Sequence, residues 1–97
     1  MIVYIAHPYR DNPEENIKRV KKYVRQAIDS GYLPICALLE IGHLLGKIDE
    51  NVAMDLCYRY IDIADEIWMC GDWERSEGCK LELAYARSRN KRIVFKL

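Results

Sequence analysis

The chain has 97 residues, of which 51% are hydrophobic and 31% are charged. This composition predicts one globular domain over residues 1–97, because a disordered chain would be poorer in apolar residues and two domains would need more length. The formal net charge is zero, so no overall field attracts nucleic acid or an anionic membrane. The sequence also lacks the pattern of a signal peptide and any apolar run long enough to cross a bilayer. We expect neither nucleic acid nor membrane as a partner.

The cysteines are widely spaced and do not form the close pairs that zinc or redox centres need. They are Cys36, Cys57, Cys70 and Cys79. Neither of the two histidines, His7 and His43, has a second ligand at metal-binding spacing. The pattern predicts free, buried thiols in a reducing cytoplasm, and no metal or other cofactor.

The first half of the chain predicts two strands with a helix between them. Residues 2–6 are a short β-branched and aromatic run, typical of a buried parallel strand. Asn12 as N-cap, Pro13 at the first helical position and apolar residues at helical spacing predict a helix that Gly31 ends. Residues 32–37 predict a second strand, whereas residues 38–46 fit either a loop or a short helix.

The second half predicts two more helices and two more strands. Asp49 can cap a helix whose apolar positions keep helical spacing as far as Ala64. A strand over 66–70, a loop over 71–75, a helix over 76–89 and a strand over 92–97 follow. This alternation predicts a three-layer α/β fold, flavodoxin- or Rossmann-like, with a parallel sheet of about four strands and helices on both faces.

Ligands of such sheets bind beyond the carboxyl ends of the strands, where the helix over 76–89 begins. Ser76 and Gly78 put a hydroxyl and a small residue at its start, so free N–H groups there can bind an anion, although Ser76 also fits a plain N-cap. Glu82 follows within two turns and can act as nucleophile or base, or can be a solvated helix glutamate.

Three residues near the end of the first strand have both a functional and a structural interpretation. Arg10 can neutralise a phosphate or pair with Asp11 at the surface. Tyr4 is typical of a core position, although its hydroxyl needs a partner there. His7 is more typical of a structural or solvated histidine than of a metal ligand.

Two further residues also have both a functional and a structural interpretation. Asp55 stands beside the apolar stripe of its helix, so it is either a surface residue or one half of a carboxylate pair. Trp73 can stack on a base or cover the core.

Three segments resemble the nucleoside 2-deoxyribosyltransferase-like superfamily, especially its small members and the deoxynucleoside 5'-monophosphate N-hydrolases. They are VYIAHPYR from Val3, IADEIWMCG from Ile63 and SEGCKLELAYA from Ser76. The last is the most specific, because its serine-to-glutamate spacing and small-residue helix match the family pattern. The resemblance runs nearly end to end.

The resemblance implies that Glu82 is the nucleophile on the anomeric carbon of a sugar and that Tyr4 orients its carboxylate. It also implies that Arg10 and Ser76 touch a 5'-phosphate. In this superfamily an acid on the preceding helix handles the base, and Asp55 is the nearest candidate. His7 stands where small residues are usual, which implies a narrower pocket or a different ligand.

The resemblance and the residues together predict an enzyme that cleaves or transfers the N-glycosidic bond of a nucleoside or nucleoside 5'-monophosphate. The expected substrate-binding residues are Arg10, His7, Ser76, Gly78 and Trp73. The alternative is a catalytically silent nucleotide-binding or sensing module, and a third possibility is a structural protein with a vestigial ligand edge.

The apolar segment over residues 38–45 predicts a homodimer or a larger even-numbered oligomer. A 97-residue domain has a limited core, and five large aliphatic residues exceed what one short segment normally buries within its own chain. They are Leu38, Leu39, Ile41, Leu44 and Leu45. The alternative is that they cap the sheet within the monomer.

Overall fold

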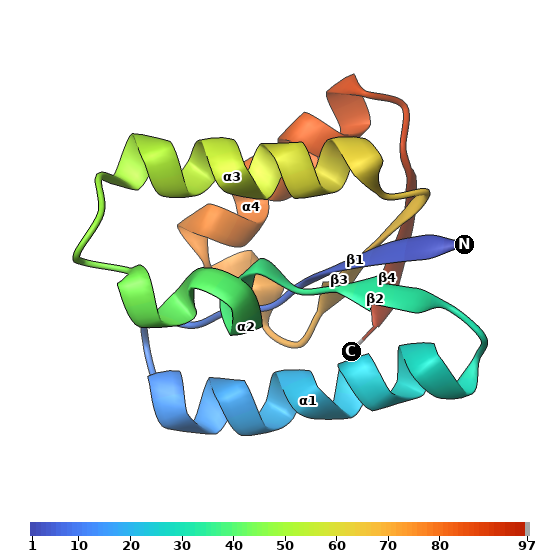
Figure 1. Cartoon of the computed structure of the whole chain (residues 1–97), viewed down its shortest axis with the longest axis horizontal. Helices are drawn as coiled ribbons and strands as arrows, with labels where there is room; N and C mark the ends of the chain where they lie inside the picture. The colour runs from blue at the N-terminus through green and yellow to red at the C-terminus, as the bar shows by residue number, and fades with distance from the viewer. Residues whose placement is uncertain (97) are drawn as a thin grey trace.

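Four parallel strands form the centre of the molecule (Figure 1). The structure is a computed structural model that describes residues 1–96. The strands are β1 (Ile2–Ala6), β2 (Leu33–Ile35), β3 (Glu66–Cys70) and β4 (Arg92–Lys96), in the spatial order β2-β1-β3-β4. β1 and β3 are therefore the inner strands, and nearly all of their side chains are buried.

Helices cover both faces of the sheet, which gives three layers (Figure 1). The main helices are α1 (Pro13–Asp29), α3 (Glu50–Ile63) and α4 (Glu77–Ser88). On one face, Val3 and Ile5 of β1 pack with Val20 of α1. On the other, Tyr4 and Ala6 pack in one cluster with residues of α3 and α4. The three-layer α/β fold predicted from the sequence is confirmed.

The helix starts follow the predicted capping chemistry. The Asn12 side chain accepts a hydrogen bond from the Glu15 N–H at the start of α1, and Pro13 is the first helical residue. The Asp49 carboxylate accepts from the Asn51 N–H at 2.7 Å at the start of α3. Ser76 accepts from the Cys79 N–H at 3.2 Å at the start of α4. Each cap satisfies an N–H group that has no partner within its helix.

The segment after β2 differs from the expected strand. β2 ends at Ile35, Cys36 is the N-cap of the short helix α2 (Ala37–Ile41), and a 3₁₀ turn η1 (Gly42–Leu44) follows. The Tyr32 N–H bonds to the Ala27 carbonyl and so belongs to the turn that ends α1. A second 3₁₀ turn, η2 (Trp73–Arg75), lies within the predicted loop before α4.

The strand order places a switch in chain direction between β1 and β3. The chain leaves β1 through α1 toward β2, and it then returns across the opposite face to β3. The loops at the carboxyl ends of these two strands therefore diverge and leave a crevice. Within residues 1–96, no helix combines the length and the apolarity that crossing a bilayer requires.

Candidate active site

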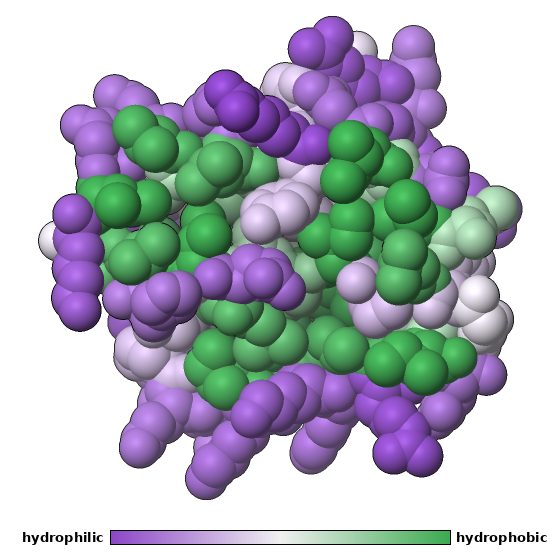
Figure 2. Space-filling model, in the orientation of Figure 1, coloured by the Kyte–Doolittle hydropathy of each residue, from purple (hydrophilic) through white to green (hydrophobic). Residues whose placement is uncertain are grey.

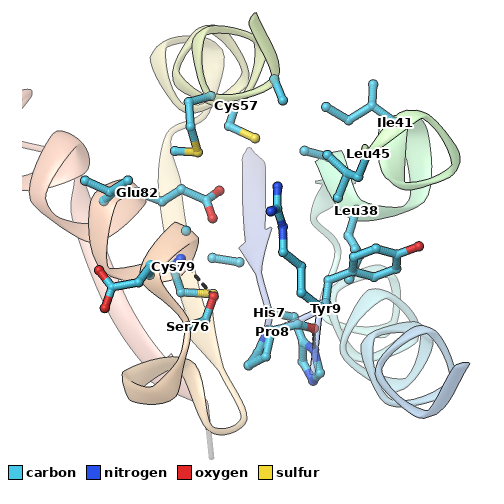
Figure 3. Close-up of a pocket in the computed structure, with 18 of the residues that line it drawn as sticks. His7, Pro8, Tyr9, Leu38, Ile41, Leu45, Cys57, Ser76, Cys79 and Glu82 are labelled. Atoms are coloured by element: carbon cyan, nitrogen blue, oxygen red, sulfur yellow. Dashed lines mark hydrogen bonds between the residues drawn. The ribbon is translucent and has the colours of Figure 1, made fainter. Parts of the chain in front are cut away.

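A cavity of about 540 Å³ opens at the carboxyl end of β1. Its walls come from the loop after β1, from α2 and the residues that follow it, from α3, and from the first two turns of α4. In Figure 3 the Glu82 carboxylate points into this space from α4, and Leu38, Ile41 and Leu45 line the side across from it. Three of the five aliphatic residues in the 38–45 segment thus line the cavity.

Glu82 lies on the inward face of α4, which explains why this helix carries a carboxylate into the core. Cys79, Glu82, Leu83 and Ala86 are its buried residues, at spacings of three, four and seven along one helix face. Glu82 is only 7% exposed. The Tyr4 hydroxyl, on the neighbouring inner strand β1, donates a hydrogen bond to Glu82 Oε2. The structure therefore brings together the two residues that the resemblance assigns to the reacting centre.

The environment of Glu82 favours a carboxyl group that titrates near neutral pH. Burial raises the pKa of Glu82 from 4.5 to about 7, while the hydrogen bond from Tyr4 lowers it. Burial also raises the pKa of Tyr4 well above its usual 10, and the adjacent Glu82 carboxylate adds to that rise. Tyr4 thus remains a phenol that donates to Glu82, and Glu82 ionises in the range where a base or nucleophile works at neutral pH.

Two thiols line the same cavity but are not nucleophiles near neutral pH. Burial raises the pKa of Cys57 from 9.0 to about 12, and the Glu82 carboxylate adds to the effect. Burial likewise raises the pKa of Cys79 to about 12. Because the thiolate is the reactive form of cysteine, the carboxylate of Glu82 is the better nucleophile of this cluster.

The N-terminus of α4 lies at the edge of the cavity with Ser76 and Gly78 in its lining. The Ser76 hydroxyl oxygen caps the helix at Cys79, which leaves its hydrogen free to donate. The N–H groups of Glu77 and Gly78 are in the first helical turn, where a helix supplies no partner for them. This end of the cavity can therefore hold an anionic or hydroxyl group of a ligand.

Two arginines lie at the mouth of the cavity, and within the described part of the chain only one of them forms an ion pair. Arg10 lines it but forms an exposed ion pair with Glu50 at the start of α3. Arg75 also lines the mouth and forms no ion pair within residues 1–96. Sequence reasoning singled out Arg10 and missed Arg75. Arg75 directly precedes the N-cap Ser76, and this position could have marked it as a residue near the anion-binding end of α4.

His7 is packed into the wall rather than free in the cavity. Its side chain is 7% exposed, and Nδ1 lies 2.8 Å from the Pro8 carbonyl oxygen. A carbonyl only accepts, so Nδ1 carries the hydrogen in the neutral ring. Burial lowers the pKa of His7. Its Nε2 faces Gly71, where a Cβ atom would lie 3.1 Å away, which favours glycine at that position.

Two predicted site residues lie outside the cavity. Asp55 is on the exposed side of α3, where its carboxylate pairs with Arg59 Nε at 2.9 Å. Trp73 lies in η2 and packs against Phe95 of β4, with 5.5 Å between ring centroids. On α3, Met54 and Cys57 line the cavity, whereas Asp55 between them does not. Within residues 1–96, no three potential metal ligands gather at one point.

Two solved structures share this fold. A CMP N-glycosidase, BcmB, from Clostridium botulinum is similar with a TM-score of 0.70 and 17% sequence identity, over 98% of this chain and 70% of that chain. A 2-desoxiribosyltransferase from Leishmania mexicana is similar with a TM-score of 0.62 and 20% identity, over 97% of this chain and 62% of that chain. These likenesses confirm the predicted resemblance at the level of the fold.

Residues 1–96 match the family described as a domain of unknown function, DUF7768, and the chain belongs to that family. The sequence has no significant match among curated proteins. The chain spans about two thirds of the length of the two similar structures.

Proposed function

We propose that this protein cleaves or transfers the N-glycosidic bond of a nucleoside or nucleoside 5'-monophosphate, with Glu82 as the nucleophile. The observation that carries the proposal is the buried Glu82 carboxylate, held by Tyr4 and pointing into a cavity at the switch point of the sheet. The fold shared with an N-glycosidase and a 2-desoxiribosyltransferase supports the same class of reaction.

The proposed reaction runs in two steps, as in retaining glycosidases. The Glu82 carboxylate attacks the anomeric carbon while the bond to the base breaks, through an oxocarbenium-like transition state. Water or a second base then releases the sugar from the glycosyl-enzyme. Tyr4 is a positioning residue, because its hydrogen bond to Oε2 orients the other carboxylate oxygen toward the sugar.

One observation favours a second candidate, a nucleotide-binding module without turnover. Apart from Glu82, every carboxylate that lines the cavity is exposed. Among residues 1–96, the cavity therefore lacks a second buried acid that could protonate a departing base. Such a module would bind nucleotides by calorimetry and release no free base.

Chromatographic detection of free base from a panel of nucleosides and nucleoside 5'-monophosphates separates the two candidates. We expect base release that scales with enzyme concentration. Binding without release, over long incubation at high enzyme concentration, would contradict catalysis and support the silent module.

If Arg75 at the cavity mouth binds a phosphate, its substitution should weaken binding of a nucleoside monophosphate more than binding of the free nucleoside. Arg75 has no ion-pair partner among residues 1–96, so we expect Arg75→Gln to weaken binding of a nucleoside monophosphate about tenfold and of the free nucleoside little. Arg10→Ala should do less, because Glu50 already holds Arg10. Arg87→Gln, which removes the same charge from an exposed position on α4 outside the cavity, is the control for calorimetry. Equal loss for both ligands would refute a phosphate role.

We also propose that the chain forms a homodimer through α2, η1 and α3. Leu39 is 37% exposed and Val52 is 52% exposed, and Figure 2 shows hydrophobic patches over this face. A charge at the centre of such an interface disrupts it, so light scattering should show that Leu44→Glu splits the dimer. His43→Glu, on the exposed neighbour, should do less. A monomeric wild type at micromolar concentration would contradict the proposal.

A further inference from the structure

Among residues 1–96, the cavity offers a departing base no buried carboxyl group besides Glu82. A neutral purine or pyrimidine leaves a sugar readily only when it receives a proton, normally from a carboxyl group whose pKa is raised by burial. Glu82 is the only buried carboxyl group among the described residues that line this cavity, and the proposed function uses it as the nucleophile. A different group would have to supply the proton.

Neither Tyr4 nor His7, which are buried in the wall, nor the half-buried Cys57 fills that role. The Cys57 thiol holds its proton strongly, because burial raises its pKa to about 12. Tyr4 donates its hydrogen to Glu82, and the Nδ1 hydrogen of His7 is directed at the Pro8 carbonyl. The side across from Glu82 is aliphatic, with Leu38, Ile41 and Leu45 (Figure 3).

The charge of the cavity lining is the second observation. Four carboxylates line it, from Asp11, Glu50, Glu77 and Glu82. Two arginines do so, Arg10 and Arg75. Arg10 is paired with Glu50 and Glu77 with Lys80, so Asp11 and Glu82 are the lining carboxylates without an ion pair among residues 1–96. With Glu82 ionised, the lining keeps a net negative charge, and the buried Glu82 carboxylate attracts a cationic base to the reacting end of the cavity.

We propose that the substrates are N-glycosides of a cationic base, such as an N-ribosylpyridinium or an N7-alkylated purine nucleoside. This inference rests on the proposed function and narrows it. A cationic base needs no proton to leave, so the missing acid is no obstacle. Its positive charge also suits the carboxylate-rich lining and stabilises the ionised form of Glu82 beside it.

The reaction balances with water as the only other reactant. A Glu82 carboxylate oxygen forms a bond to the anomeric carbon as the bond from that carbon to the ring nitrogen breaks. The electron pair of the broken bond stays on the nitrogen, which neutralises the base. Water then attacks the anomeric carbon of the glycosyl ester, Glu82 leaves as the carboxylate, and one proton passes to solvent.

Two matched pairs of probes test the proposal. Nicotinamide riboside is compared with its neutral dihydro form, and 7-methylguanosine with guanosine, with the spontaneous rate subtracted in each case. General acid catalysis typically contributes 10²–10⁴-fold, so we expect kcat/KM to be at least about 100-fold higher for the cationic member of each pair. Equal rates within a pair, or faster cleavage of the neutral member, would overturn this inference and leave the proposed function standing. Cleavage of no probe in either pair, nor of any substrate in the wider panel, would overturn both.

An added acid supplies an independent readout. Cys57→Asp and Met54→Glu each place a carboxyl group in the α3 wall of the cavity. We expect at least one of the two to raise guanosine cleavage by tenfold or more, with Met54→Gln as the matched uncharged control. Two folded variants that leave guanosine cleavage unchanged would contradict the claim that a missing acid sets the substrate class, and Met54→Glu guards against Cys57→Asp failing to fold.

Discussion

Glu82→Gln is expected to lower kcat/KM by at least about 10³-fold toward any substrate that the wild type cleaves. The amide keeps the shape of the side chain and still accepts from Tyr4, but it cannot form the glycosyl ester, so the loss reports nucleophilic chemistry rather than binding. Free base is measured chromatographically. Glu14→Gln, on the exposed start of α1, is the matched control, and retention of more than about a tenth of the activity in Glu82→Gln would contradict the assignment.

Glu82→Gln is also expected to increase the stability of the fold at alkaline pH, although it removes activity. Ionising Glu82 in the folded state is costly, because burial raises its pKa from 4.5 to about 7. The folded state therefore binds a proton more tightly than the unfolded state, and this contribution to stability is lost as the pH rises from 4.5 through about 7. At pH 8 the wild type should be roughly 3 kcal/mol less stable than a chain with a neutral group there.

Urea unfolding at pH 5 and pH 8 measures this effect. We expect Glu82→Gln to have a higher free energy of unfolding than the wild type at pH 8 and a similar one at pH 5. A variant that is inactive and more stable at pH 8 has lost chemistry and kept its fold. A variant that is less stable at both pH values would show that Glu82 is a structural residue.

Tyr4→Phe is expected to move the pH dependence of catalysis as well as the rate. The hydrogen bond from Tyr4 lowers the pKa of Glu82, so its removal should raise that pKa above about 7 and shift the acid limb of kcat/KM to higher pH. At the alkaline plateau, loss of a hydrogen bond to a charged group corresponds to a roughly 10- to 100-fold lower rate.

Tyr60→Phe is the control for this experiment, because the Tyr60 ring stacks on that of Tyr4 at 6.5 Å between centroids but lies outside the cavity. We expect it to leave the acid limb in place. An acid limb in Tyr4→Phe at the same or a lower pH than in the wild type would show that Tyr4 does not act on the Glu82 carboxylate.

Local sequence signals were sufficient to predict most of the fold. The caps at Asn12, Asp49 and Ser76 act within four residues of the chain, and the structure confirms the helices that they begin. The segment after β2 was ambiguous because its apolar residues serve two purposes. Leu38 packs against the core and also lines the cavity, so no single helical stripe marks it.

The site was predictable where function and local pattern coincide. Glu82 occupies the buried stripe of its helix, and Tyr4 lies on an inner strand, so each position is visible in the periodicity. The partnerships across the fold were not visible. The ion pair between Arg10 and Glu50 joins residues 40 positions apart. Asp55 and Arg59 form a local pair within α3, but the sequence did not show which side of that helix faces the cavity.

The central claim, that Glu82 forms a covalent bond to the sugar, is tested most directly by intact-protein mass spectrometry of enzyme quenched during turnover. A 2-fluoro-substituted nucleoside slows release of the sugar by destabilising the oxocarbenium-like transition state. The account predicts a mass increase equal to one glycosyl group, located by peptide mapping on the peptide that contains Glu82, and absent from Glu82→Gln. An active enzyme that accumulates no adduct, or that carries the adduct on another residue, would contradict it.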